Sequence, residues 1–338
     1  MVAGKKKRAL TITLSVLLAI ILLLLSGFAF LYFNGKSGFH KNDTAIKTET
    51  VTPVNENEIE YGGKTYILNK NIVSVLFIGI DKERIENNEG YGINGQADSL
   101  FVAAVDTFNG SVKVIPISRE TMVDVDMYDD AGEYAGIRRE QICLAYAFGN
   151  NAEKSSKNVL KSVRRTLYNI NISSYVTVDM RAVERLTVKM GGVTVPCLEE
   201  ITVNGKPRKT GENLLLKGKS ATEYIRTRGD DAEANNRRME RQKQFLSATV
   251  STAGNQIIND FSLLMTYYNT VSPYMDSNLS ASKLTYLASL VLAKDIGSKI
   301  EYKKIEGRTS KGEKWIEFEQ NEQSVTEILL DVFYTEKT

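Results

Sequence analysis

The chain has 338 residues, of which 42% are hydrophobic and 25% are charged, and its formal net charge is +2. Without the four basic residues before the first apolar run, the net charge becomes −2, which argues against nonspecific nucleic-acid binding. The only histidine, His40, lies outside every patterned segment, which excludes a Ser-His-Asp or Cys-His arrangement and an imidazole zinc site in the folded part.

Residues 9–33 form an uncharged, mostly apolar run. At about 1.5 Å per residue, a helix of this length crosses a hydrocarbon core of roughly 30 Å. Basic residues 5–8 precede the run, so the positive-inside rule places residues 1–8 in the cytoplasm. A cleaved signal would have a shorter apolar region and a small-residue cleavage site, which we do not find. The sequence predicts a single-pass cell-membrane protein with an extracellular C-terminal domain.

Residues 34–70 are polar and predict an extracytoplasmic stalk with little structure, so the folded domain is expected over 71–338. The β-branched run 71–80 predicts a buried strand that ends at Asp81, and 99–106 predicts a second strand. Asn109 and Gly110 predict a hairpin turn into a third strand over 111–118. These strands are expected to be antiparallel neighbours.

Apolar residues at helical spacing predict helices over 139–148 and 154–170. Short strands over 174–180 and 191–197 are expected to flank a helix that contains Val183 and Leu186, and another helix is expected from Asn236. The C-terminal third adds an apolar segment over 278–292, a strand-like 299–305 and a segment over 324–334 that opens with Ser324 and Glu327 at capping-box spacing. Alternating strands and helices indicate an α/β layered domain.

The two cysteines, Cys143 and Cys197, do not have the spacing of a metal site. We interpret them as small buried apolar side chains. A disulfide between them is the alternative in an exported domain, and sequence alone does not report whether they approach each other.

Two aspartates flank the loop between the first two predicted strands. Asp81 lies where the first strand ends and Asp98 where the next begins, so antiparallel pairing brings both carboxylates together. Such a pair suits Mg²⁺, which takes one or two carboxylates and leaves its other positions to water and phosphate. Aspartates are also common at turns, so two ordinary loop-end residues are the alternative.

Arginines form a second group. Arg119 follows the third strand near the same sheet edge. The densest cationic cluster comprises Arg226, Arg228, Arg237, Arg238 and Arg241, with Gln242 beside the last. Arg226 and Arg228 project to one side if their segment is extended, and Arg238 and Gln242 share a helix face. Guanidinium groups bind phosphate bidentately, so the cluster suits a diphosphate, and a solvated basic face is the alternative.

Taken in chain order, these segments resemble the LytR-CpsA-Psr family. The matching pieces are GIDK, QADSLFVAAVD, SRETMVDV, LAYAFGN, GGVTV, YIRTRGD and RRMERQKQ, spread over residues 71–250. The resemblance implies an exported three-layer α-β-α domain with a central mixed sheet that binds a polyprenyl diphosphate lipid. It also implies transfer of the attached glycopolymer, such as teichoic acid or capsular polysaccharide, onto peptidoglycan.

The resemblance also assigns roles by position. It places Asp81 and Asp98 on the family's magnesium-associated aspartates and Arg119 on the arginine of its PRDT motif. Arg226 and Arg228 match its paired arginines, and Arg238 and Gln242 match the Arg and Gln of its next helix.

Three positions depart from the family pattern. Gln96 stands where an arginine is usual, Glu120 replaces an aspartate, and Gln141 replaces a lysine or arginine. Two cationic contacts are therefore expected to be absent, which would weaken catalysis or change the diphosphate that fits.

We therefore expect a Mg²⁺-dependent phosphotransferase in which a peptidoglycan sugar hydroxyl attacks the sugar-linked phosphorus of a polyprenyl-diphosphate glycan. The expected catalytic residues are Asp81, Asp98, Arg119, Arg226 and Arg228; the expected diphosphate ligands are Arg119, Arg226, Arg228, Arg238 and Gln242; and the expected metal ligands are Asp81 and Asp98. Asp81 is the first candidate for the general base, because no histidine is available.

Two other functions are considered. A catalytically weak scaffold that binds the lipid or wall polymer is motivated by Gln96 and Gln141. A regulator of transcription would need a DNA-binding module in the cytoplasm, and about eight residues before the anchor are too few for one.

Overall fold

The computed structural model describes residues 26–27, 29–41, 43–82, 85, 95–129, 131–227, 234–260, 262–293, 300–312 and 315–337. Within these ranges, no helix combines the length and the apolar character that a membrane crossing requires. Most of the anchor predicted over 9–33 lies outside the described residues, so the anchor stays a prediction. Arg228 also lies outside them.

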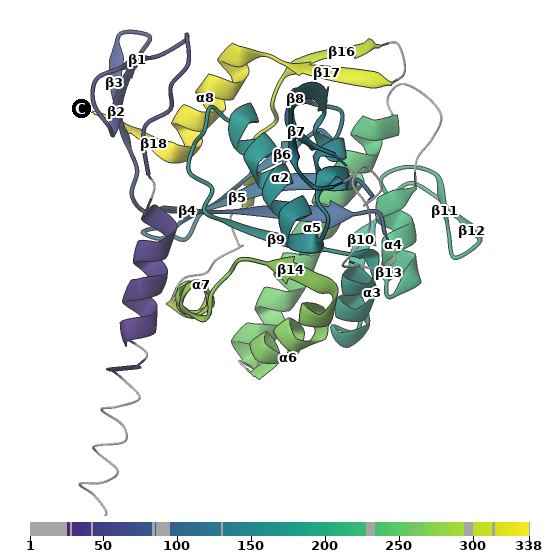
Figure 1. Ribbon diagram of the computed structural model, residues 1–338. Helices are drawn as coiled ribbons and strands as arrows, with labels where there is room; N and C mark the ends of the chain where they lie inside the picture. Colours follow the sequence, from purple (N-terminus) through teal and green to yellow (C-terminus); the bar gives the residue numbers. More distant parts are fainter. Residues whose placement is uncertain are drawn as a thin grey trace, which may run out of the picture.

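The centre of the fold is a six-stranded mixed sheet in the order β14-β9-β4-β5-β6-β15 (Figure 1). Its strands are β4 (Ile72–Ile80), β5 (Ala97–Asp106), β6 (Val112–Ile117), β9 (Ser174–Val178), β14 (Met275–Ser277) and β15 (Ile300–Tyr302). β4, β5 and β6 are antiparallel neighbours, whereas β9 runs parallel to β4 and β15 runs parallel to β6. The predicted strands over 71–80, 99–106 and 111–118 are confirmed. The strand predicted over 174–180 ends at Val178, because Asp179 caps the helix that begins at Met180.

Helices pack on both faces of this sheet, because successive strand residues point to opposite sides. On one face, Leu76 and Ile78 of β4 belong to the same buried cluster as Val159 and Val163 of α2 (Ala152–Thr166). α2 begins where the Asn151 side chain accepts a hydrogen bond from the backbone of Lys154. The other face of β4 carries Val73 and Val75, which cluster with Tyr286 and Leu290 of α7 (Ala281–Ala293). The fold is a mixed α/β domain around a central mixed sheet, as predicted.

A second buried cluster lies beyond the sheet, where α3 (Met180–Lys189), α4 (Lys219–Arg226), α5 (Ala234–Asn259) and α6 (Ser262–Val271) pack together. Small hairpins border it: β10 (Val193–Pro196) with β13 (Asn213–Leu216), and β11 (Ile201–Val203) with β12 (Lys206–Arg208). The remaining elements are β7 (Met122–Tyr128), β8 (Tyr134–Gln141), η1 (Ile142–Phe148), η2 (Ser272–Tyr274), β16 (Gly307–Lys311), β17 (Ile316–Gln320) and α8 (Glu322–Phe333).

The segment predicted as a stalk folds into the domain. β1 (Thr52–Pro53), β2 (Glu58–Tyr61) and β3 (Lys64–Leu68) form a sheet with β18 (Tyr334–Glu336) from the C-terminus. Ile46, Ile59 and Leu68 are buried in the main core, and the Ile46 backbone N–H donates to the Tyr334 hydroxyl at 2.8 Å. The prediction of little structure over 34–70 is therefore wrong, because its scattered apolar residues pack against a distant part of the chain.

A helix over residues 29–40 extends past the predicted end of the anchor at Phe33 into this segment, and it packs on α7. A Cβ atom added to Gly35 would lie 2.1 Å from the carbonyl oxygen of Ser282. The rings of Tyr32 and Tyr286 meet edge to face at 5.1 Å. Glycine is required at position 35 because any larger side chain would push the two helices apart.

Three local predictions need correction. Residues 139–141 belong to strand β8, where Arg139 pairs with Asp124 of β7, and only 142–148 are helical, as a 3₁₀ helix. The helix α8 begins two residues before Ser324, because the Asn321 side chain caps it by accepting from the Ser324 backbone N–H. Arg226 ends the helix α4 and is not part of an extended stretch. For residues 139–141, pairing with β7 decided the conformation.

Candidate active site

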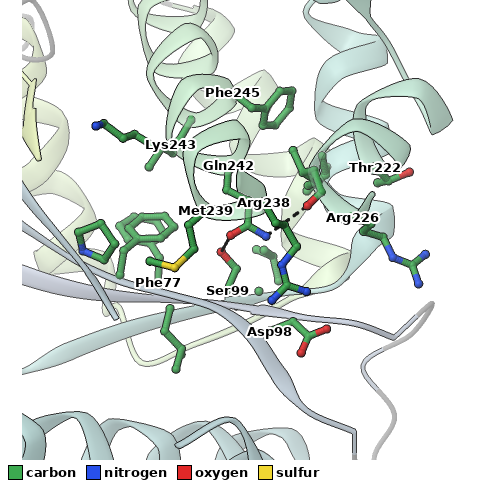
Figure 2. Close-up of a pocket in the computed structure, with 18 of the residues that line it drawn as sticks. Phe77, Asp98, Ser99, Thr222, Arg226, Arg238, Met239, Gln242, Lys243 and Phe245 are labelled. Atoms are coloured by element: carbon green, nitrogen blue, oxygen red, sulfur yellow. Dashed lines mark hydrogen bonds between the residues drawn. The ribbon is translucent and has the colours of Figure 1, made fainter. Parts of the chain in front are cut away.

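A cavity of about 750 Å³ lies between the central sheet and helices α3, α4 and α5. Its apolar lining includes Phe77, Phe101, Pro116, Met239, Phe245 and Leu246. All the predicted site residues that the structure describes also line it: Asp81, Asp98, Arg119, Arg226, Arg238 and Gln242. Figure 2 shows the Arg238 side chain directed toward Asp98, with Met239 and Phe77 farther along the cavity. The cavity thus has a charged end and a long apolar part.

The two aspartates lie at adjacent strand ends. Ile80 of β4 pairs with Ala97 of β5 across a register shift, and the Asp81 N–H donates to the Gln96 carbonyl at 3.4 Å. This pairing brings Asp81 and Asp98 to the same sheet edge, as the sequence predicts. Each carboxylate pairs with an arginine, since Asp98 contacts Arg119 and Asp81 contacts Arg226 at 2.7 Å.

Asp98 is the more buried of the two, with 15% of its side chain exposed against 35% for Asp81. Burial raises the pKa of Asp98; the charges of Arg119 and Arg238 oppose this rise, and the nearby charge of Asp81 adds to it. Two neighbouring carboxylates, one held in a poorly solvated place, favour a cation between them.

Arg119 is held by neighbours from three directions. Its guanidinium pairs with Asp98, donates to the Gln96 side-chain oxygen, and lies 3.6 Å from the Cys143 sulfur. Burial raises the pKa of the Cys143 thiol, so the thiol is neutral at pH 7 and the charge partner of Arg119 is Asp98. Gln96, which replaces a family arginine, thus supplies a neutral acceptor beside Arg119 where an arginine would supply a second positive charge.

The second glutamine, Gln141, serves the fold. Its side-chain amide is buried and donates to the Ile316 carbonyl at 2.6 Å, which ties β8 to β17. It does not line the cavity. Cys143 and Cys197 are both buried and free, so the structure contains no disulfide between them.

Gln242 lines the cavity, but its amide is bonded to protein on both sides. Its oxygen accepts from the Ser99 hydroxyl at 3.3 Å, and its nitrogen donates to the Ile225 carbonyl at 3.3 Å. Figure 2 shows both bonds. The Gln242 side chain therefore joins α5 to β5 and to α4.

Arg241 is a functional candidate that sequence reasoning left without a role. Its guanidinium, 3% exposed, donates to the carbonyls of Tyr224 at 3.0 Å and of Thr227, and it pairs with Glu199. These carbonyls flank Arg226 at the C-terminus of α4, where a cation is favourable. The available signal is the helical spacing of Arg238 and Arg241, which puts both near the same wall.

We expect Arg241→Met to lower the free energy of unfolding by about 3 kcal/mol, because breaking a buried ion pair strands polar groups. Arg237 pairs with the same Glu199 at 2.8 Å but is 38% exposed, so Arg237→Met is the matched control and should cost less than about 1 kcal/mol. Urea denaturation of both variants measures the difference. Equal losses would contradict a bracing role for Arg241.

The acidic side chains at the charged end decide whether Mg²⁺ fits there. Among the described residues, no three or more His, Cys, Asp or Glu side chains gather as an all-protein metal site would require. Asp81 and Asp98 nevertheless fit the usual mode of Mg²⁺, which is one or two carboxylates with water and substrate phosphate completing the shell. The residues therefore suit a metal that is bound together with a diphosphate.

Comparison with known proteins shows the family of the chain. The chain belongs to the LytR_cpsA_psr family, whose model matches residues 29–331. It is 26% identical over 249 residues to a protein of Oceanobacillus iheyensis named polyisoprenyl-teichoic acid–peptidoglycan teichoic acid transferase TagU, covering 74% of this chain and 71% of that one. It is 24% identical over 285 residues to the TagU of Enterococcus faecalis, covering 84% of each chain.

The fold is shared with a solved structure. The crystal structure of TagV from Bacillus subtilis superposes with a TM-score of 0.61 at 22% identity. The match covers 78% of this chain and 97% of that chain.

Proposed function

We propose that this protein is a phosphotransferase that moves a glycopolymer from a polyprenyl-diphosphate carrier onto a sugar hydroxyl of peptidoglycan. The observation that carries the proposal is a cavity with three arginines and two aspartates at one end and a mostly apolar lining along the rest. A lipid diphosphate likewise has a charged head and a long apolar chain. The relatives are named as transferases of polyisoprenyl-linked teichoic acid to peptidoglycan, which supports the same class of substrates.

The charged end supplies the binding energy for the diphosphate. Arg119, Arg226 and Arg238 offer guanidinium groups that bind phosphate oxygens bidentately. In the described structure Arg119 and Arg226 pair with Asp98 and Asp81. An incoming diphosphate therefore competes with these carboxylates for the arginines. Asp81 and Asp98 would release the arginines if they held a divalent cation.

In the proposed reaction, the acceptor hydroxyl forms a bond to the sugar-linked phosphorus, and the bond from that phosphorus to the bridging oxygen breaks. Polyprenyl phosphate leaves with that oxygen, and positive groups near it offset the developing charge. Asp81, the more exposed carboxylate, is the candidate to take the acceptor proton. When bound, Mg²⁺ on Asp81 and Asp98 would supply further positive charge to the diphosphate.

The test incubates the purified full chain in detergent with Mg²⁺, a polyprenyl-diphosphate saccharide and a peptidoglycan oligomer, and follows the coupled product by mass. We expect product with Mg²⁺ and none after chelation. Binding of the lipid without any product would contradict the transferase and favour the scaffold, the function that Gln96 and Gln141 motivate. Product without divalent metal would contradict the metal requirement alone.

We also propose that the domain lies on the extracytoplasmic side of the cell membrane, held by an N-terminal helix over 9–33. The basic residues 5–8 and the extracytoplasmic location of peptidoglycan support this orientation. A reporter fused to the C-terminus should be active only outside the cytoplasm. Activity only in the cytoplasm would overturn the topology.

A further inference from the structure

Tyr302 lines the cavity from the outer edge of the central sheet, on strand β15. Its hydroxyl donates to the Lys243 carbonyl of α5 at 3.0 Å and shares a hydrogen bond with the Ser247 hydroxyl at 2.7 Å. The Lys243 ammonium lies 4.9 Å from the centre of the ring. These contacts join the edge strand to α5 beside the cavity.

Two elements place these contacts far from the charged end. Along α5, Ser247 follows Arg238 by nine residues, which is about 13 Å at 1.5 Å per residue. Along β6, Val114 pairs with Tyr302, and the strand ends at Ile117, two residues before Arg119. Ile117 follows Val114 by three residues, which is about 10 Å at 3.3 Å per residue. In Figure 2, Lys243 and Asp98 likewise lie at opposite ends of the residues drawn.

The lining between these ends is apolar, and it includes Phe101, Pro116 and Leu246. A prenyl chain bound there gains affinity for each methylene removed from water, about fourfold per group. The gain in affinity stops at the chain length that the apolar lining can cover. A tyrosine whose hydroxyl is bonded to the helix holds its ring in one position, whereas an aliphatic side chain would leave the closure free to move.

We infer that Tyr302 closes the apolar end of the cavity and thereby sets the length of prenyl chain that the protein encloses. This specificity role rests on the proposed function, because it takes the apolar part as the place of the lipid chain. Chain beyond Tyr302 contributes little to affinity, since it stays outside the wall.

The experiment measures dissociation constants of the full chain for a series of prenyl phosphates from geranyl to undecaprenyl. For the wild type, affinity should rise with chain length and then level off. Tyr302→Ala removes the ring and should move the levelling to a chain longer by at least one isoprene unit. Tyr302→Phe keeps the ring and should level off where the wild type does.

The control is Tyr267→Ala in α6. Tyr267 is buried, its hydroxyl donates to Gln256 of α5, and it does not line the cavity. The substitution Tyr267→Ala loosens the packing of α5 without opening the cavity end. The chain length at which its affinity levels off should therefore match that of the wild type. Tyr302→Leu provides the same comparison as Tyr302→Ala if the alanine variant does not fold.

An unchanged levelling point in both Tyr302→Ala and Tyr302→Leu would overturn the inference, as would an equal shift in Tyr267→Ala. Binding of prenyl phosphates would still support the proposed function in either case. If no prenyl phosphate binds to the wild type, both the inference and the proposed function fail.

Discussion

Arg119→Ala is expected to lower turnover by at least about 100-fold while the protein stays folded, because removing one preorganised charged donor from a buried site costs about that much. Arg119 pairs with Asp98 in a place where both side chains are largely shielded from water. Its loss removes positive charge where the diphosphate gains negative charge. Single-turnover rates with the polyprenyl-diphosphate saccharide give the effect, and circular dichroism reports the fold.

Two variants sharpen this prediction. Arg119→Lys keeps a charge but loses the guanidinium fork, so it should retain part of the activity. Arg139→Ala removes an arginine that is 54% exposed and pairs with Glu319, outside the cavity, so it should leave turnover unchanged. If Arg119→Ala and Arg119→Lys both unfold, Arg119 is a structural residue and its assignment to the site is wrong.

Asp98→Asn is the second variant expected to abolish turnover. The substitution keeps the shape of the side chain and removes the charge that pairs with Arg119 and that would hold a metal. Asparagine still offers Arg119 an acceptor, so the variant should fold, with a lower unfolding midpoint because the buried guanidinium loses its charge partner. The measurements are the rate of product formation and the thermal unfolding midpoint. Turnover within about tenfold of the wild type would contradict the role of Asp98.

The pKa of Asp98 gives this prediction a pH dependence. Burial raises that pKa above the ordinary value of 3.8, so protonation removes the working carboxylate at a higher pH than for an exposed aspartate. The profile of kcat/KM should therefore fall on the acid side above that value. Asp81→Asn removes a neighbouring negative charge that contributes to the rise in the pKa of Asp98. The acid limb of any residual activity should therefore shift to lower pH. An unmoved limb would assign it to another group.

The same shift has a consequence for stability. Because the folded-state pKa of Asp98 is raised, the folded protein holds its proton more firmly than the unfolded chain does. The contribution of Asp98 to stability is thus full below the unfolded pKa and is lost as pH rises through the folded pKa. Asp98→Asn should lack this dependence.

The sheet and its two aspartates were predictable because their causes are local. The apolar runs of β4 and β5 are adjacent in sequence, and antiparallel neighbours place Asp81 and Asp98 at one edge whatever surrounds them. The α5 helix could likewise be predicted from its periodicity, as could the shared face of Arg238 and Gln242. The ordered motifs then indicated the family, which the match over 29–331 confirms.

Contacts with distant parts of the chain could not be predicted from the sequence. The segment over 34–70 reads as a polar linker in any short window, yet β3 pairs with β18, which lies at the other end of the chain. Gln242 stays a predicted phosphate ligand, and its bonds to Ser99 and Ile225 could not be predicted from the sequence. Gln141 reads as a lost cation of the site, yet it bonds to Ile316.

The sequence by itself determined the central strands, several helices around them, the family and the residue types of a charged site. Only the tertiary structure decided which arginine meets which aspartate, that Arg241 braces the end of α4, and that Tyr302 closes the cavity. The physical reason is the distance along the chain over which each interaction acts. Backbone periodicity and turn chemistry act over a few residues, whereas ion pairing, burial and cavity shape depend on side chains that folding brings together from distant parts of the chain.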